Sequence, residues 1–197
     1  MEKFDVFDFD GTIYKKDCSM EFWKFCLKKD KMVLMYFPIQ VSGMILKTLK
    51  IIKTKKLKEL FFSFLNRYSE KEILEKVDEF WEEEKKNICN WYIEKPKLNY
   101  RICISASPKF ILEKITKSLA IDELIATDMP INGKNKNKII GNNCKGEEKV
   151  TLLKEKYKEF IIEEFYTDSK VDMPLCDIAQ KYYFIKNGEL VRKGDNL

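Results

Sequence analysis

Two carboxylates lie one residue apart near the start of the chain, where Asp8 and Asp10 flank Phe9 at the end of an apolar run. Positions two apart on a strand face the same side, so the two side chains converge, and Gly11 permits a tight turn directly after them. Crowded carboxylates repel each other unless a cation lies between them or one of them is protonated. The pair therefore predicts a cation site or acid–base chemistry. A strand followed by an Asp-Gly turn without any chemistry is the alternative.

Other residues that can do chemistry follow further expected strands. Ser105 follows the second strand, Asp168 and Asp172 follow the fourth, and Lys149 lies in the first turn of the helix before the fourth. Each has an ordinary alternative, because serine and aspartate are common in turns and most lysines lie on surfaces. The carboxyl ends of parallel strands meet at one edge of a sheet, so we expect these residues to converge with Asp8.

The composition limits the chemistry that is available. The 197 residues include no histidine. This excludes histidine triads, phosphohistidine intermediates and histidine zinc sites, and leaves acid–base work to carboxylates and lysines. The net charge of +5 arises from interleaved lysines and acids without an aromatic and basic ladder, so we expect no nucleic acid partner. The six cysteines show no pair at two-residue spacing, and we recognise no signal peptide, which predicts a reducing, cytoplasmic setting with buried thiols.

The elements that position these residues alternate between strand and helix. The expected strands are 3–9, 100–104, 123–127, 163–166 and 182–185. The alternation in the C-terminal half indicates a parallel sheet with right-handed crossovers and a ligand site at the carboxyl ends of its strands. Residues 15–95 are expected to be helical throughout, with an N-cap at Asp17 or Ser19 and a capping box of Ser69 and Glu72. This pattern is typical of a helical module inserted into a core.

A segment without charged residues, 32–46, lies within this module between two lysine clusters. At ~1.5 Å per residue, a helix of this length spans about 22 Å, which is short of the roughly 30 Å hydrocarbon core of a bilayer. A transmembrane span is therefore not expected. Two alternatives stay open: a buried helix of the module, and an interfacial helix that lies on an anionic membrane.

Four stretches resemble, in order, the successive motifs of the haloacid dehalogenase-like hydrolase superfamily. They are Asp8-Phe9-Asp10-Gly11-Thr12, Ile104-Ser105-Ala106-Ser107-Pro108, Gly146-Glu147-Glu148-Lys149 and Thr167-Asp168-Ser169-Lys170-Val171-Asp172. The stretches 139–144 and 172–175 resemble the phosphoserine-phosphatase-like branch, which has a helical cap between its first and second motifs. The resemblance implies an α/β fold with a Rossmann-like three-layer α/β/α core, a parallel sheet and an all-helical cap. Residues 1–14 and 96–197 would form the core, and residues 15–95 the cap.

The same resemblance implies a magnesium-dependent phosphomonoester hydrolase that works through an aspartyl-phosphate. Asp8 would be the nucleophile, Asp10 the general acid–base, and Ser105 and Lys149 would hold the phosphoryl group. The substrate-binding positions implied are Gly11, Thr12, Ser105, Ala106 and Lys149. The metal positions implied are Asp8, Asp10, Asp168 and Asp172, the last of which would support Lys149 or a metal-bound water. A divalent cation with a lysine offsets the repulsion between a carboxylate and a phosphate dianion, and oxygen ligands suit Mg²⁺.

The resemblance leaves the substrate open. Recognition of the phosphoserine carboxylate favours a bidentate arginine, but the cap offers only Arg67, at a spacing that is not that of a core position. The layout of residues 32–46 with the third and fourth motifs is similar to phosphatidylglycerophosphate phosphatases. It implies a lipid-linked phosphomonoester and a peripheral contact with the inner face of the membrane. A soluble phosphomonoester, a phosphotransferase or mutase, and a non-catalytic binder of a phosphorylated ligand remain alternatives, and the oligomeric state is not predicted.

Overall fold

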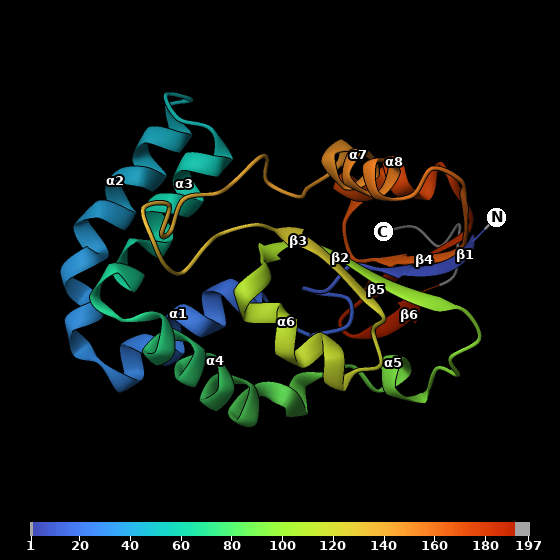
Figure 1. Cartoon of the computed structure of the whole chain (residues 1–197), viewed down its shortest axis with the longest axis horizontal. Coiled ribbons are helices and arrows are strands. Elements are labelled where there is room, and N and C mark those ends of the chain that lie inside the picture. Colours follow the sequence, from blue (N-terminus) through green and yellow to red (C-terminus); the bar gives the residue numbers. More distant parts are fainter. Residues whose placement is uncertain (1, 192–197) are drawn as a thin grey trace.

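A six-stranded sheet in the order β3-β2-β1-β4-β5-β6 forms the centre of the computed structural model, which describes residues 2–191 (Figure 1). The strands are β1 (Glu2–Phe7), β2 (Tyr100–Pro108), β3 (Glu123–Thr127), β4 (Phe160–Thr167), β5 (Ala179–Lys186) and β6 (Glu189–Val191). The pairs among β1 to β5 are parallel, and β6 is antiparallel to β5. The predicted parallel sheet is therefore confirmed, with an antiparallel edge strand that was not predicted.

The additional strand β6 depends on a two-residue turn. Asn187 and Gly188 both have positive φ, at 54° and 78°, and they connect the paired strands directly. Positive φ at both central residues is typical of the hairpin turn that Asn-Gly favours. The signal for this hairpin was thus present in the sequence.

Helices cover both faces of the sheet, as the three-layer prediction requires. Helices α7 (Glu147–Lys156) and α8 (Met173–Cys176) lie over one face, and α6 (Lys109–Ser118) and α5 (Asn90–Glu94) lie over the other (Figure 1). Because β1 is covered on both sides, it buries Phe4 and Val6 in one apolar cluster and Phe7 in another. This explains why the strand reads as a nearly continuous apolar run.

The segment between β1 and β2 is helical, as predicted. It comprises α1 (Cys18–Lys29), η1 (Lys31–Tyr36), α2 (Phe37–Thr48), α3 (Thr54–Phe61), η2 (Phe62–Arg67), α4 (Glu70–Glu84), η3 (Lys85–Asn87) and α5. Asp17 caps α1 by accepting from Met20 N, and Ser69 forms the expected capping box with Glu72 at the start of α4. One apolar cluster extends from these helices into the core through the contact of Phe22 with Phe110. The division into a core of residues 1–14 and 96–197 and a cap of residues 15–95 stays a prediction.

The apolar segment 32–46 is not one helix. A 3-10 helix, η1, is followed by α2, which has Pro38 in its first turn. Proline is tolerated there because the backbone N–H groups of a first turn have no acceptor within the helix. Within residues 2–191, no helix is long and apolar enough to cross a membrane. All six cysteines are buried and free, which confirms the prediction of buried thiols.

Candidate active site

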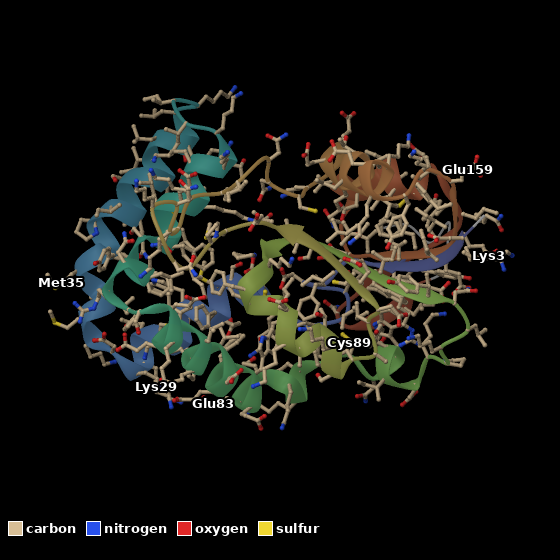
Figure 2. All side chains as sticks on the ribbon, in the orientation of Figure 1. Lys3, Lys29, Met35, Glu83, Cys89 and Glu159 are labelled. Carbon is tan, nitrogen blue, oxygen red and sulfur yellow. The ribbon has the colours of Figure 1, made fainter. Side chains whose placement is uncertain are left out.

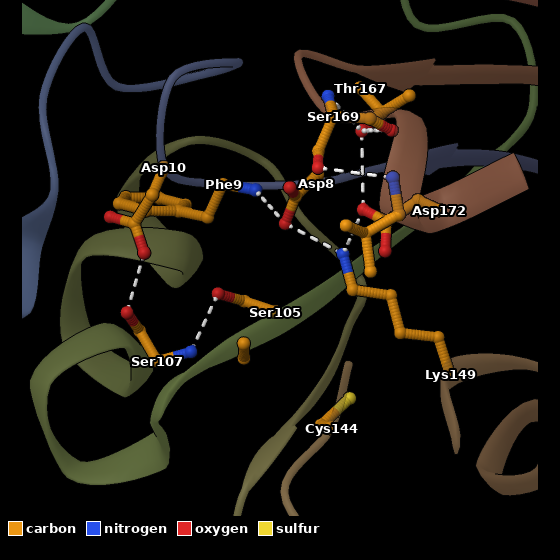
Figure 3. Close-up of polar contacts among 12 residues, drawn as sticks. Asp8, Phe9, Asp10, Ser105, Ser107, Cys144, Lys149, Thr167, Ser169 and Asp172 are labelled. Carbon is orange, nitrogen blue, oxygen red and sulfur yellow. Dashed lines mark hydrogen bonds and ion pairs between the residues drawn. The ribbon is translucent and has the colours of Figure 1, made fainter. Parts of the chain in front are cut away.

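The predicted residues converge at the carboxyl ends of the strands, as the parallel sheet requires. Asp8 comes directly after β1, and Ser105 lies near the end of β2 (Figure 3). Asp168 follows β4. They line a cavity of about 620 Å³. Its lining includes Asp8, Asp10, Ser105, Ala106, Lys149, Asp168 and Asp172. Of the predicted site residues, Gly11 and Thr12 are absent from this lining.

Lys149 is a buried cation held between two carboxylates. Its Nζ lies 2.9 Å from Asp8 Oδ1 and 2.7 Å from Asp172 Oδ2, and the residue is 1% exposed (Figure 3). Burial by itself would lower the pKa of Lys149, but the neighbouring Asp8 and Asp172 outweigh it and raise the pKa. Asp172 also accepts from Gly146 N and Thr167 Oγ1. Asp172 therefore fixes the position of Lys149 from the side opposite Asp8.

Asp8 is oriented by its own backbone and by Lys149. The Asp8 N–H donates to Tyr166 O at 2.9 Å, and Asp8 Oδ1 accepts from Phe9 N at 2.8 Å. Burial raises the pKa of the Asp8 carboxyl, and Lys149 opposes that rise. Asp8 Oδ2 makes no hydrogen bond within residues 2–191, so it is available to attack a substrate or to bind a cation.

Asp10 lines the same cavity but has partners different from those of Asp8. Its Oδ1 accepts from Cys18 N at 2.7 Å, and its Oδ2 accepts from Ser107 Oγ at 2.5 Å (Figure 3). Burial, and then the nearby Asp17, raise the pKa of Asp10 to about 7. A carboxyl group with this pKa can both donate and accept a proton near neutral pH, as a general acid–base must.

Asp168 lies against the backbone of Gly11. A methyl group added at Gly11 would come within 2.1 Å of Asp168 Oδ2, and the φ of Gly11 is +71°. Glycine at this position therefore serves two purposes, because it permits the turn and makes room for the carboxylate. Burial, and then Asp8, raise the pKa of Asp168 to about 6.

This donor set fits Mg²⁺. Within the described residues, no group of three or more histidine, cysteine, aspartate or glutamate side chains is arranged to hold a metal ion. Mg²⁺ is commonly held by one or two carboxylates and keeps several waters. Asp8 and Asp168 meet that requirement, whereas Asp10 and Asp172 are bound to other partners. The pKa values of Asp8 and Asp168 are raised mainly by burial, with a smaller contribution from neighbouring carboxylates.

The remaining predicted residues shape the loops of the site. Ser105 is 1% exposed and its Oγ accepts from Ser107 N at 3.1 Å. The amides of Gly11 and Thr12 donate to Lys16 O and Phe9 O, so they close the turn after Asp10. Their predicted contact with substrate stays a prediction.

Sequence reasoning missed Lys58, which the cap contributes to the cavity. Its Nζ donates to Ala106 O at 2.5 Å, so a helix of the cap contacts the C-terminal end of β2. Burial lowers the pKa of Lys58, although Asp10 and Asp17 oppose this. Nothing in the sequence distinguishes Lys58 from its neighbouring lysines. Ser107 was also missed as a partner of Asp10, although it belongs to the second motif.

The cap wall of the cavity is mainly apolar. Trp23, Met44, Leu57 and Phe61 line it, together with the buried Gln40, whose Nε2 donates to Phe61 O at 2.8 Å. Neither of the two described arginines lines the cavity, since Arg67 pairs with Asp30 at 3.4 Å and Arg101 lies buried elsewhere. The cap wall therefore provides no guanidinium for a substrate carboxylate.

A parallel α/β sheet thus brings several carboxylates at its strand ends together with a buried lysine from α7. A family model described as haloacid dehalogenase-like hydrolase matches residues 6–177, and the chain belongs to this family. The predicted superfamily and hydrolase activity are thereby confirmed.

Solved structures share this fold at low sequence identity. A protein with unknown function from Bordetella pertussis Tohama I is 17% identical, with a TM-score of 0.78 over 92% of this chain and 89% of that chain. A phosphoserine phosphohydrolase-like protein from Francisella tularensis subsp. tularensis SCHU S4 is 16% identical, with a TM-score of 0.60 over 92% and 86%. A probable phosphoserine phosphatase from Vibrio cholerae is 12% identical, with a TM-score of 0.62 over 92% of this chain and 55% of that chain. No curated protein sequence matches the chain.

Proposed function

We propose that the protein is a magnesium-dependent phosphomonoester hydrolase that uses Asp8 as its nucleophile. The observation that carries this proposal is the position of Lys149, whose Nζ is 2.9 Å from Asp8 Oδ1 in a buried site with Asp168 nearby. A carboxylate and a phosphate dianion repel each other, and a fixed cation offsets that repulsion. Mg²⁺ bound by Asp8 and Asp168 would neutralise further charge on the phosphoryl group.

The two first-motif acids divide the reaction between them. An oxygen of Asp8 forms a bond to phosphorus while the bond from phosphorus to the leaving oxygen breaks, and protonated Asp10 gives its proton to that oxygen. Asp10, now ionised, takes a proton from water as the water oxygen attacks the phosphorus of the aspartyl-phosphate. Inorganic phosphate leaves, and Asp8 and Asp10 return to their starting states. Lys149 stays charged throughout, and Ser105 would donate to a phosphoryl oxygen.

The substrate class that we propose first is a lipid-linked phosphomonoester, hydrolysed at the cytoplasmic face of the membrane. The apolar cap wall of Trp23, Leu57 and Phe61 supports it, because such a wall stabilises an apolar leaving group and offers few partners to a polar one. The six free cysteines fit a reducing compartment.

A soluble phosphomonoester is the second candidate. The fold shared with the phosphoserine phosphohydrolase-like protein favours it, and the acidic Asp17 at the cavity could accept from an ammonium group. Transfer of the phosphoryl group to a second hydroxyl in place of water would make the protein a phosphotransferase. The relative rates of substrate turnover with and without an added alcohol distinguish a phosphotransferase from a hydrolase.

A panel of phosphomonoesters, including aryl, soluble and long-chain substrates, tests the proposed reaction. We expect hydrolysis with Mg²⁺, loss of activity in excess chelator, and a fall of several orders of magnitude for Asp8→Asn, since the amide cannot form the covalent intermediate. Asp177→Asn is the matched control, because Asp177 is exposed and outside the cavity. Full activity of Asp8→Asn, or in chelator, would contradict the mechanism.

A further inference from the structure

Helix α2 of the cap has its polarity reversed. Its buried residues are Gln40 and Gly43, whereas Phe37, Ile39, Met44 and Ile45 are exposed. In η1 before it, the buried residue is Val33. Nine of the eighteen exposed large apolar side chains within residues 2–191 lie in the segment 32–51. They are Met32, Leu34, Met35, Phe37, Ile39, Met44, Ile45, Leu49 and Ile51.

We call these nine side chains the apolar cap face. Figure 2 shows Met35 extending away from the cap on the side remote from the sheet. A surface helix normally turns its apolar residues inward, and gatherings of exposed apolar residues on soluble proteins mark interaction sites. The reversed pattern therefore indicates a partner that covers α2 from outside.

The charges around the apolar cap face indicate what kind of partner covers it. From residue 31 to residue 58 the chain has seven lysines and no acidic residue. Among them, Lys50 and Lys53 are exposed in the connection from α2 to α3, next to Leu49 and Ile51. Apolar side chains fringed by lysines match an anionic lipid surface, in which the apolar groups enter the acyl boundary and the lysines contact headgroups. A symmetric dimer through this face would instead bring the lysines of two copies together.

The apolar cap face is also continuous with the active-site cavity. Phe37 and Met44 are 48% and 52% exposed, and both line the cavity that contains Asp8 and Lys149. Apolar surface thus extends from the phosphate-binding end of the cavity to the outside of α2. An amphiphile whose phosphate lies at Asp8 can keep its apolar chain against this surface.

We propose that residues 32–51 dock the protein on an anionic bilayer and direct the cavity toward lipid-borne phosphomonoesters. The substrate direction rests on the proposed function, but the docking does not. Docking is peripheral, because none of the helices described within residues 2–191 can span a bilayer. The side chains from Leu49 to Ile51 contact the lipid, and Phe37 and Met44 lie where the lipid meets the cavity.

Vesicle flotation tests the docking directly. We expect the whole chain to float with phosphatidylcholine/phosphatidylglycerol vesicles at low salt, and to bind phosphatidylcholine alone more weakly. Added salt should weaken the first interaction, because it screens the lysines. The double variant Leu49→Glu/Ile51→Glu should lose about tenfold or more in affinity, since both side chains are largely exposed in the free protein and transfer into the interface. Neither residue lines the cavity, so hydrolysis of a soluble aryl phosphate should stay unchanged.

The matched control places the same charge on another exposed apolar pair. Ile93 and Leu98 are 61% and 79% exposed and lie outside the cap face, so Ile93→Glu/Leu98→Glu should float as the wild type does. Asp8→Asn should also float, so docking can be judged even if hydrolysis is not found. The proposal is overturned if the wild type stays in the supernatant at low salt, or if both double variants change binding equally. It is also overturned if the wild type is a dimer that ignores vesicles and that Leu49→Glu/Ile51→Glu dissociates.

Discussion

Gly11 and Asp168 show how the absence of one methyl group makes room for a carboxylate of the proposed metal site. The Cβ of any other residue at position 11 would overlap the Asp168 carboxylate, which lines the same cavity as Asp8. The glycine of the first motif therefore matters to a carboxylate more than 150 positions further along the chain. A requirement of this kind is a contact in space, and no local pattern in the sequence displays it.

Gly11→Ala should weaken the response to magnesium. The methyl group displaces Asp168, so we expect the Mg²⁺ concentration for half-maximal activity to rise about tenfold, equivalent to roughly 1.4 kcal/mol. The positive φ adds a separate loss of about 1–2 kcal/mol in the free energy of unfolding. Gly133→Ala is the matched control, because Gly133 has a φ of +65° but open space around its Cβ. If both variants shift the magnesium titration equally, backbone strain and not Asp168 is the cause.

The convergence of Asp8, Ser105 and Asp168 could be predicted from the sequence, because the carboxyl ends of parallel strands meet. The predicted end of the second strand was wrong, however, since β2 continues past Ser105 to Pro108. The contribution of Lys58 could not be predicted. It is one of seven lysines between residues 31 and 58, and only the contact of α3 with the C-terminal end of β2 distinguishes it.

At the scale of elements, α4 is tied to the active-site loop by its C-terminal end. Glu84 accepts from Tyr14 Oη at 2.5 Å, from Lys16 Nζ at 2.9 Å and from Asn87 Nδ2 at 2.8 Å. Tyr14 and Lys16 belong to the loop that follows Asp10. Although burial raises the pKa of Glu84, these donors outweigh it and lower the pKa below its usual value. The ionised carboxylate thus connects the cap to the loop of the first motif.

Glu84→Gln should therefore destabilise the fold in a pH-dependent way. A carboxylate with a lowered folded-state pKa contributes stability above its unfolded pKa, and that contribution is lost as the pH falls through the folded-state value. We expect a loss of about 1.5–3 kcal/mol in the free energy of unfolding near neutral pH. The difference from wild type should shrink below the ordinary glutamate pKa of about 4.3. Denaturant titrations at several pH values measure this.

The control for that titration is Glu82→Gln on the same helix. Glu82 is exposed and pairs with Lys85 at 2.6 Å, and such surface pairs contribute little. A loss for Glu82→Gln as large as that for Glu84→Gln would show that helix charge, and not the contact with Tyr14 and Lys16, sets the stability.

The elements that sequence analysis placed well are those with a clear apolar period or a cap. Ser69 and Glu72 open α4 as predicted, and the apolar run before Asp8 is a strand. Residues 32–46 failed as a single helix because Pro38 begins a new one. Which face of α2 is buried could not be predicted, because its apolar residues follow no helical period. In the structure, Gln40 and Gly43 are buried against α3.

At the scale of the whole molecule, the cavity belongs to neither layer alone. The core supplies Asp8 and Asp168 at the ends of β1 and β4 and Lys149 from α7, and the cap supplies Lys58 and the apolar wall. The proposed function therefore assigns phosphate chemistry and leaving-group recognition to different parts of the chain. This separation explains why the four motifs predict the reaction while leaving the substrate open.

The phosphoryl group on Asp8 is the most direct test of the central claim. Enzyme mixed with an aryl phosphate and Mg²⁺, quenched in acid and measured as intact mass, should carry one phosphoryl group, located by peptide mapping to the segment containing Asp8. Asp10→Asn should accumulate more of it, because an aryl leaving group needs little protonation whereas hydrolysis of the intermediate still needs a base. Asp8→Asn and enzyme in excess chelator should carry none. The account would be contradicted if the wild type and Asp10→Asn both turned over substrate without any phosphoryl adduct. It would also be contradicted if Asp8→Asn still carried the adduct.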